Sequence, residues 1–206
     1  MKANATLQGK RFTRQSLARE IWGNITRKYK PIEEPIAGPE DLARRERVRE
    51  ISAELSKQAG IRAPYIFFEN DWKAVSVMNS VGRGRIRVNC SLAYENERFI
   101  RGVLGHEFLH IKKMHNLKNF ALVFALMTNF DEKPECWQAG LLSAVAKKQE
   151  YGADLFSAQM NGMDVMVETL QRQCETRSPH IGGLFAPSLH ERLEKLMKAK
   201  EEMESR

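Results

Sequence analysis

The 206-residue sequence lacks several features that would assign it to a class at once. It has three widely spaced cysteines and no C-x-x-C pair, which excludes a disulfide framework or a cysteine metal site. The apolar run at residues 120–127 is too short to cross a bilayer, which takes about 20 residues. The N-terminus has no apolar signal segment, and the G-R-G at residues 82–84 lacks the rest of a phosphate-binding pattern. We therefore expect a cytoplasmic protein without a transmembrane segment.

What the sequence does contain is typical of one globular catalytic domain with a basic extension. Hydrophobic residues make up 42% and charged residues 29%, which excludes a disordered or fibrous protein. Residues 1–30 hold eight Lys or Arg and one acid, so this arm carries the whole net charge of +7. Such an arm can bind an anionic surface, either membrane or nucleic acid, dock onto the rest of the chain, or simply aid solubility. Two prolines follow it, and we predict an arm and linker at 1–35 and a domain at 36–206.

The motif that organises the chain is G-H-E-F-L-H, which starts at Gly105. His106 and His110 are four residues apart, so on a helix both imidazoles lie on one face and can hold a single zinc ion. Glu107, between them, can take a proton from a water whose pKa the zinc has lowered to about 7. The pattern alone also fits a helix with two surface histidines. Apolar neighbours on both sides favour a buried site.

A catalytic zinc needs a third protein ligand and an open position for water. Glu150 and Asp154, on a predicted helix at about 135–161, share one face: Glu150 can reach the metal, and Asp154 can accept the free N–H of a ligating histidine. Two solvated acids on an amphipathic helix are the alternative, which the apolar flanks make less favourable. His115 lies nine residues after His106, and a continuous helix would turn it to the far side, so we interpret it as a structural or rim residue and not as the third zinc ligand.

The remaining pattern predicts an α+β fold, mainly helical, with a small sheet beside the active-site helix. A helix should begin at Pro39, with acids in its first turn, and end at Gly60. Three short strands are expected at 65–68, 75–78 and 86–88. The run at 120–127 is predicted to form a buried helix, or else an apolar lip for substrate side chains. The apolar face of the first helix is expected to comprise Leu42, Val48, Ile51 and Leu55.

The sequence V-L-G-H-E-F-L-H-I-K-K-M-H, followed later by E-Y-G-A-D, resembles the HtpX-type zinc metallopeptidases. This family belongs to the glutamate-zincins (gluzincins) and includes membrane CAAX prenyl endopeptidases and soluble bacterial relatives. The resemblance covers roughly residues 39–197. It implies a zincin-like domain, a hydrolase activity on protein or peptide substrates, and one Zn²⁺ per chain. The short apolar run at 120–127 implies a soluble member.

The resemblance also implies a role for individual residues. It places Arg192 near the cleft, where the guanidinium could steady the oxyanion. The family usually has a His-Pro pair before the closing helix, whereas this chain has Ala186-Pro187, so that histidine's role could fall to His180, to His190 or to neither. The resemblance places the metal on His106, His110 and Glu150, with Glu107 as general base and Asp154 as the carboxylate that contacts a ligating histidine. It also places Ser76, Val77, Met78 and Asn79 on the strand that would pair with substrate. The alternative is that this strand is an ordinary interior one.

The function predicted is zinc-dependent endopeptidase. Two other classes stay open on the sequence alone. One is a metallopeptidase-like regulator that cleaves or binds a DNA-associated repressor, which the basic arm would suit. The other is a non-catalytic module with a structural zinc, against which Glu107 argues because a structural site needs no base.

Overall fold

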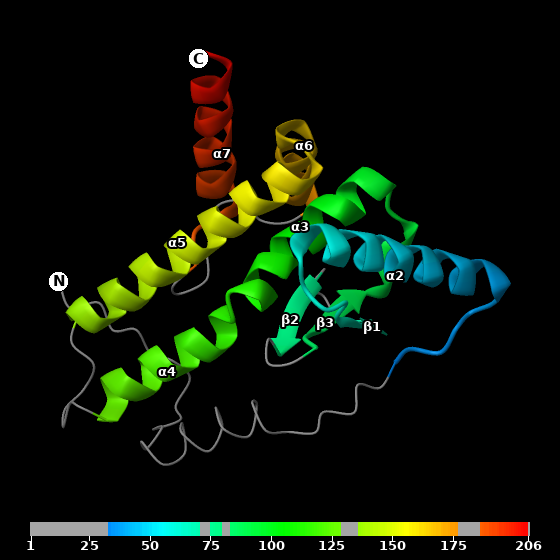
Figure 1. The fold of residues 1–206 in the computed structure, drawn as a ribbon, viewed down its shortest axis with the longest axis horizontal. Coiled ribbons are helices and arrows are strands. Elements are labelled where there is room, and N and C mark those ends of the chain that lie inside the picture. The colour runs from blue at the N-terminus through cyan, green and yellow to red at the C-terminus, as the bar shows by residue number, and fades with distance from the viewer. Residues whose placement is uncertain (1–32, 71–74, 80–82, 129–135, 177–185, 206) are drawn as a thin grey trace.

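The computed structural model of the chain describes residues 33–70, 75–79, 83–128, 136–176 and 186–205. The predicted basic arm at 1–30 and His180 lie outside the described residues, so the predicted boundary between linker and domain at 35/36 stays a prediction. The described part is mainly helical with one small sheet, which confirms the predicted fold class (Figure 1). The helices are α2 (Pro39–Ala59), α3 (Glu97–Lys112), α4 (His115–Thr128), α5 (Cys136–Asn161), α6 (Met163–Thr176) and α7 (Leu189–Glu204), with a 3₁₀ turn, η1, at Cys90–Tyr94.

The sheet has three strands at the predicted places, β1 (Tyr65–Glu69), β2 (Val75–Asn79) and β3 (Arg85–Asn89). Their order is β1-β3-β2, with β1 parallel and β2 antiparallel to β3, so β2 lies at an edge of the described sheet. Side chains at alternate positions of a strand point to the same face. The residues buried in this way are Ile66 and Phe68 of β1 and Ile86 and Val88 of β3.

Helices α2 and α3 pack with this buried face to form the main core. In α2 the apolar residues Val48, Ile51 and Leu55 recur every three or four positions, so they share one face and all are fully buried. Leu42 was predicted to join them but is 42% exposed. It lies in the first turn of α2, whose buried residue is Asp41, paired with Arg45 at 2.8 Å.

Helix α3 runs through the centre of the molecule, and α5 packs along it (Figure 1). Two glycines of α3 allow close packing, Gly102 against α6 and Gly105 against α5. A Cβ at Gly102 would lie 2.1 Å from Oγ1 of Thr169, and a Cβ at Gly105 would lie 2.6 Å from Oγ of Ser157. The Ser157 hydroxyl also donates to the Gly102 carbonyl at 2.8 Å. These contacts hold α5 and α6 against the stretch of α3 that carries His106.

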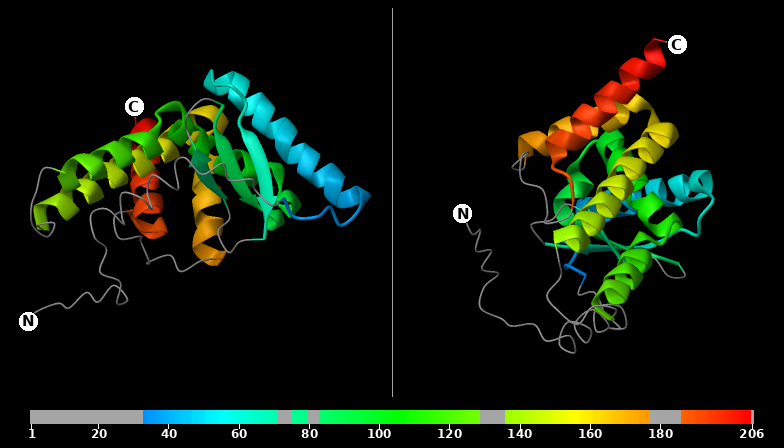
Figure 2. Two further views of the ribbon diagram at one scale, coloured as in Figure 1. Left: turned by 90° about the horizontal axis from the view of Figure 1, so that it is seen from below. Right: turned by 90° about the vertical axis from the view of Figure 1, so that its left-hand side faces the viewer.

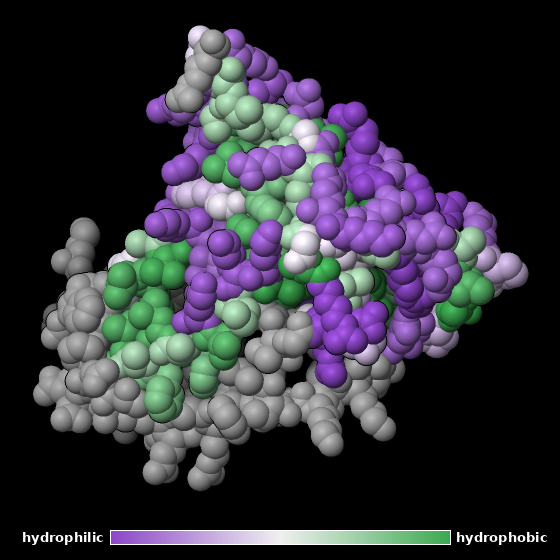
Figure 3. Space-filling model, viewed as in Figure 1, coloured by the Kyte–Doolittle hydropathy of each residue, from purple (hydrophilic) through white to green (hydrophobic). Residues whose placement is uncertain are grey.

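Helix α4 forms where the apolar run predicted a helix, but the prediction that it is buried was wrong. Phe124 is 49% exposed, and Leu117 and, on α5, Leu141 are exposed as well. Figures 1 and 2 show α4 and α5 side by side, extending away from the sheet. Figure 3 shows hydrophobic surface gathered over this pair. No described helix has both the length and the apolar character that a bilayer span requires.

Candidate metal centre

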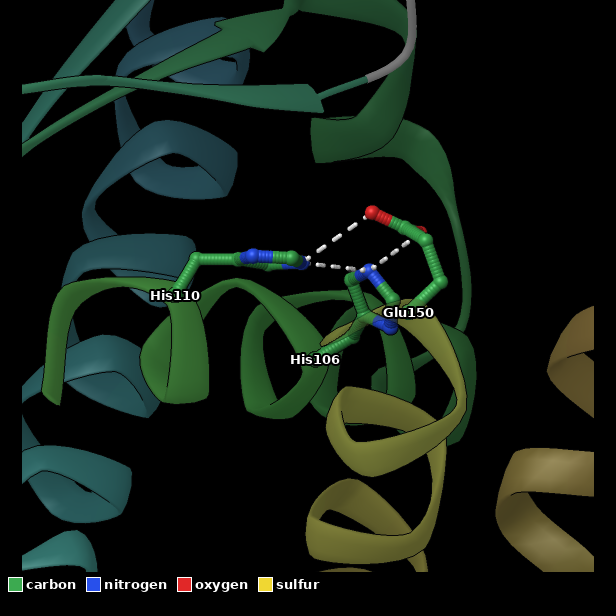
Figure 4. A group of neighbouring side chains, drawn as sticks. All are labelled: His106, His110 and Glu150. Carbon is green, nitrogen blue, oxygen red and sulfur yellow. Dashed lines mark hydrogen bonds and ion pairs between the residues drawn. The ribbon is translucent and has the colours of Figure 1, made fainter. Parts of the chain in front are cut away.

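Three side chains from α3 and α5 converge on one point (Figure 4). Nε2 of His106 and Nε2 of His110 are 3.1 Å apart. The Glu150 carboxylate faces both nitrogens, with Oε2 3.3 Å from His106 and Oε1 3.5 Å from His110. One ligand atom from each residue lies within 4.8 Å of the other two. Two imidazole nitrogens and a carboxylate oxygen suit Zn²⁺ and leave a fourth tetrahedral position for water or substrate.

The other ring nitrogen of His106 meets a buried carboxylate. Asp154, one turn after Glu150 on α5 and only 2% exposed, places Oδ1 2.8 Å from Nδ1 of His106. A carboxylate there accepts the Nδ1–H and leaves the lone pair of Nε2 directed at the site. The structure thus brings Asp154 to the contact that its spacing from Glu150 indicated.

Helix α7 adds a guanidinium that holds both carboxylates. Arg192 donates from Nε and Nη2 to the two oxygens of Asp154, at 2.9 and 2.6 Å, and its Nη1 lies 3.2 Å from Oε2 of Glu150. A capping box between Ser188 and Glu191 starts α7 one turn before Arg192 and so fixes where it projects. All three guanidinium nitrogens therefore face carboxylates. The oxyanion contact expected of Arg192 stays a prediction.

The two imidazoles differ in charge. Burial and the Arg192 charge oppose protonation of His106, but the hydrogen bond and charge of Asp154 outweigh them and raise its pKa to about 9. Burial and the neighbouring His106 charge lower the pKa of His110 to about 3. Two imidazolium ions with nitrogens 3.1 Å apart would repel each other, so the pair holds one positive charge. A divalent cation would replace that proton.

The convergence point opens into a cavity of about 330 Å³. Glu107 lines this cavity beside the two histidines, and burial raises the pKa of its carboxyl group. A carboxylate with a raised pKa is a better proton acceptor than an ordinary exposed glutamate. The cavity is also lined by Glu150 and Arg192 and by Val75, Val77, Val103, Asn116, Met166 and Gln173.

A sequence model of peptidase family M48 matches residues 43–203. The chain belongs to peptidase family M48. Its membership confirms the family predicted from the sequence, and it supports a metallopeptidase that uses a divalent metal. Searches among curated proteins and among solved structures gave no significant match. The M48 match spans α2 to α7 and so contains every described residue of the cavity.

Strand β2 of the M48 domain forms one wall of the cavity. The backbone N–H of Val77 donates to the Glu107 carboxylate, and its carbonyl accepts from Nδ2 of Asn116 at 3.1 Å. Both polar groups of Val77 therefore point to the open edge of the sheet. Ser76, Met78 and Asn79, predicted with Val77 to contact substrate, lie on the same strand, but their side chains are outside the described part.

The remaining histidines of the M48 domain fall in different places. His190, predicted as one candidate for the oxyanion, is 48% exposed on its side chain, lies 3.2 Å from Glu194, and is not among the residues that line the cavity. This placement gives that role no support.

His115 was predicted to lie on the far side of a continuous helix, and that geometry was wrong, although His115 is not in the described group of possible metal ligands. Its Nδ1 lies 2.9 Å from Nδ1 of His110. Helix α3 ends at Lys112, and Met114 takes a left-handed conformation with φ of 51°, so the count of helical turns does not continue to His115. Neither glycine nor proline marks this break, so the sequence held no signal for it.

Proposed function

We propose that this M48 protein is a zinc-dependent endopeptidase. The observation that carries the proposal is the convergence of His106, His110 and Glu150 at the end of a cavity that Glu107 also lines. A bound zinc would supply a Lewis acid that polarises the scissile carbonyl and acidifies water. The experiment below separates it from one alternative, a non-catalytic zinc module. The other alternative, a regulator that cleaves or binds a DNA-associated repressor, would show DNA binding that weakens steeply with salt.

In the proposed reaction Glu107 accepts the proton of the attacking water and later delivers it to the leaving amine. Its partly buried position, with a raised pKa, suits both transfers. Asp154 keeps the proton of His106 on Nδ1, and Arg192 holds Asp154 and Glu150 in place through three contacts. The buried charges of Asp154 and Arg192 thus orient the proposed ligands His106 and Glu150.

The edge of β2 gives the substrate a place to lie. An extended peptide can pair with an exposed strand edge through main-chain hydrogen bonds. Val77 presents both its N–H and its carbonyl there, next to Glu107. We therefore propose that substrate backbone takes over these two groups of Val77. Taking the N–H would release the Glu107 carboxylate for the water.

The test is cleavage of an unfolded protein, casein, by the full chain with measured zinc content. We expect cleavage with about one zinc per chain, loss with a chelator, and recovery when zinc is restored. Glu107→Gln should keep the zinc and lose a factor of about 10² to 10⁴ in kcat. Zinc binding without cleavage by the unmutated chain would contradict the peptidase and favour the non-catalytic module. Equal cleavage by Glu107→Gln would contradict the role of the base.

A further inference from the structure

His110 has a buried partner on the side turned away from the proposed metal position. Its Nε2 faces His106 and Glu150, whereas its Nδ1 lies 2.9 Å from Nδ1 of His115. The two rings meet edge to face, with centroids 5.0 Å apart and planes at 76°. His115 is 7% exposed. A buried pair of ring nitrogens at this distance is a hydrogen bond, so one nitrogen donates and the other accepts.

The backbone is bent to make this contact. The N–H of Met114 bonds the carbonyl of Ile111 at 3.0 Å, and the carbonyl of Met114 accepts from the N–H of Lys118 at 3.0 Å. Met114 thus closes α3 and opens α4 while it adopts φ of 51°. A non-glycine residue in this region costs about 1 to 3 kcal/mol and persists where other contacts fix it. The first residue after it is His115.

The protonation of the pair follows from the ligand geometry. If His110 binds the metal through Nε2, its one proton is on Nδ1, and Nδ1 is the donor. Nδ1 of His115 must then be the acceptor, so His115 is neutral and carries its proton on Nε2. The two ligating imidazoles therefore differ behind the metal: His106 donates to the Asp154 carboxylate, and His110 donates to a neutral imidazole.

We propose that His115 is a positioning residue that accepts the Nδ1–H of His110 and so directs Nε2 of His110 at the metal. This inference rests on the metal site of the proposed function but not on peptide cleavage. Partners of this kind orient a ligating histidine, and their loss costs about 10- to 100-fold in metal affinity. The sequence motif contains His106 and His110, and the fold brings a third histidine, His115, into contact with His110.

The test compares zinc affinities, by competition with a chelator, in chains that all carry Glu107→Gln. In His115→Leu the acceptor is lost, and we expect affinity to fall about 10- to 100-fold. In His115→Asn an oxygen can stand near the Nδ1 position, and most of the affinity should return. Unchanged affinity in His115→Leu would overturn the proposal. So would an equal loss in His115→Asn, because packing alone would then explain both.

Asn119→Ala is the matched control for the position of α4. Asn119 lies one turn after His115 and exchanges two amide hydrogen bonds with Gln149 of α5, at 2.9 and 2.7 Å. The substitution removes these two part-buried hydrogen bonds and should loosen α4 without touching His110, so zinc affinity should stay within about twofold. A loss as large as that of His115→Leu would refute the proposal.

The tautomer of His115 can be measured on the unmutated chain, so this test does not depend on a variant that folds. In the zinc-loaded, ¹⁵N-labelled protein the ring nitrogens of His115 should report a proton on Nε2 and none on Nδ1. A proton on Nδ1 of His115 would reverse the donor and overturn the proposal. If the protein binds zinc and shows this tautomer but cleaves nothing, the endopeptidase proposal fails while the role of His115 stands.

Discussion

The two ligand histidines lie one helical turn apart, yet opposite sides of the domain hold them in different ways. On the inner side, His106 meets Asp154 of α5 and Arg192 of α7, a buried and charged arrangement. On the outer side, His110 meets His115, a neutral ring at the start of α4, whose apolar face is largely exposed. We therefore expect metal binding to be coupled to global stability on the inner side only. Changes on the outer side should alter metal or substrate affinity while the core stays folded.

The largest expected effect is on the inner side, with Asp154→Asn. Removing this carboxylate leaves the buried Arg192 charge without its bidentate partner, and breaking such a pair costs about 3 to 5 kcal/mol of stability. His106 also loses the acceptor that fixes its tautomer, so zinc affinity should fall about 10- to 100-fold. Denaturant unfolding of the metal-free protein and chelator competition measure the two effects.

The double variant Asp154→Asn with Arg192→Met separates charge from packing. Because the Arg192 charge is removed together with its Asp154 partner, and Glu150 keeps its contact with His106, it should regain part of the lost stability but not the lost zinc affinity. If Asp154→Asn alone unfolds no more easily than the original chain, the inner side is not the electrostatic anchor that the contacts indicate.

A second pair of variants compares packing near the two sides. In Gly102→Ala the new Cβ would lie 2.1 Å from Thr169 of α6, so the contact between α3 and α6 must open. We expect this to cost about 1 to 3 kcal/mol of stability. In Gly140→Ala, on the exposed start of α5, the Cβ meets nothing within 4 Å, and the helix should gain about 0.5 to 1 kcal/mol. Thermal unfolding should therefore move in opposite directions. A shift of the same sign in both would contradict the packing difference.

The proton on His106 should make zinc binding depend on pH. Its folded-state pKa of about 9 lies above the ordinary 6.5, so the metal-free protein holds a proton there at neutral pH. Zinc must displace it, so affinity should rise about tenfold per pH unit up to about pH 9 and level off above. Calorimetry in buffers of different ionisation enthalpy should show about one proton released per zinc near pH 7.5.

The same pKa fixes the sign of the stability change without metal. A raised folded-state pKa contributes stability that is complete below pH 6.5 and is lost as the pH rises towards 9. The metal-free chain should therefore lose stability over this window. If neither the zinc affinity nor the stability of the metal-free chain changes with pH over this window, His106 is neutral. The inner side would then differ less from the outer side than proposed.

The smallest effect is expected on the outer side, with Asn116→Ala. Asn116 occupies the carbonyl of Val77, which an extended substrate would need. Its removal spares the substrate one displaced hydrogen bond, worth about 0.5 to 1.5 kcal/mol, so KM should fall by up to about tenfold with kcat little changed. A rise in KM would show that Asn116 helps to bind substrate and does not compete with it.

The parts of this site that follow from helical periodicity could be predicted from the sequence. His106 with His110, and Glu150 with Asp154, share faces because they are four residues apart. The three strands were predicted from short runs of apolar residues, with a glycine-containing turn between the last two. Beyond periodicity, the family resemblance placed Arg192 near the cleft, where it lines the cavity, but two other features were missed. The direction of His115 depends on one backbone angle at Met114, and the exposure of α4 depends on which faces its neighbours cover. The contacts of Arg192 depend on how α7 returns to the site.

Zinc K-edge absorption of the zinc-loaded full chain would count and identify the ligands of the proposed metal site directly. We predict four nitrogen or oxygen neighbours at about 2.0 to 2.1 Å, two of them imidazoles, with one imidazole lost in His110→Ala and none in His115→Leu. Three imidazoles or a sulfur neighbour would contradict the proposed ligand set. So would the same spectral change in His115→Leu as in His110→Ala.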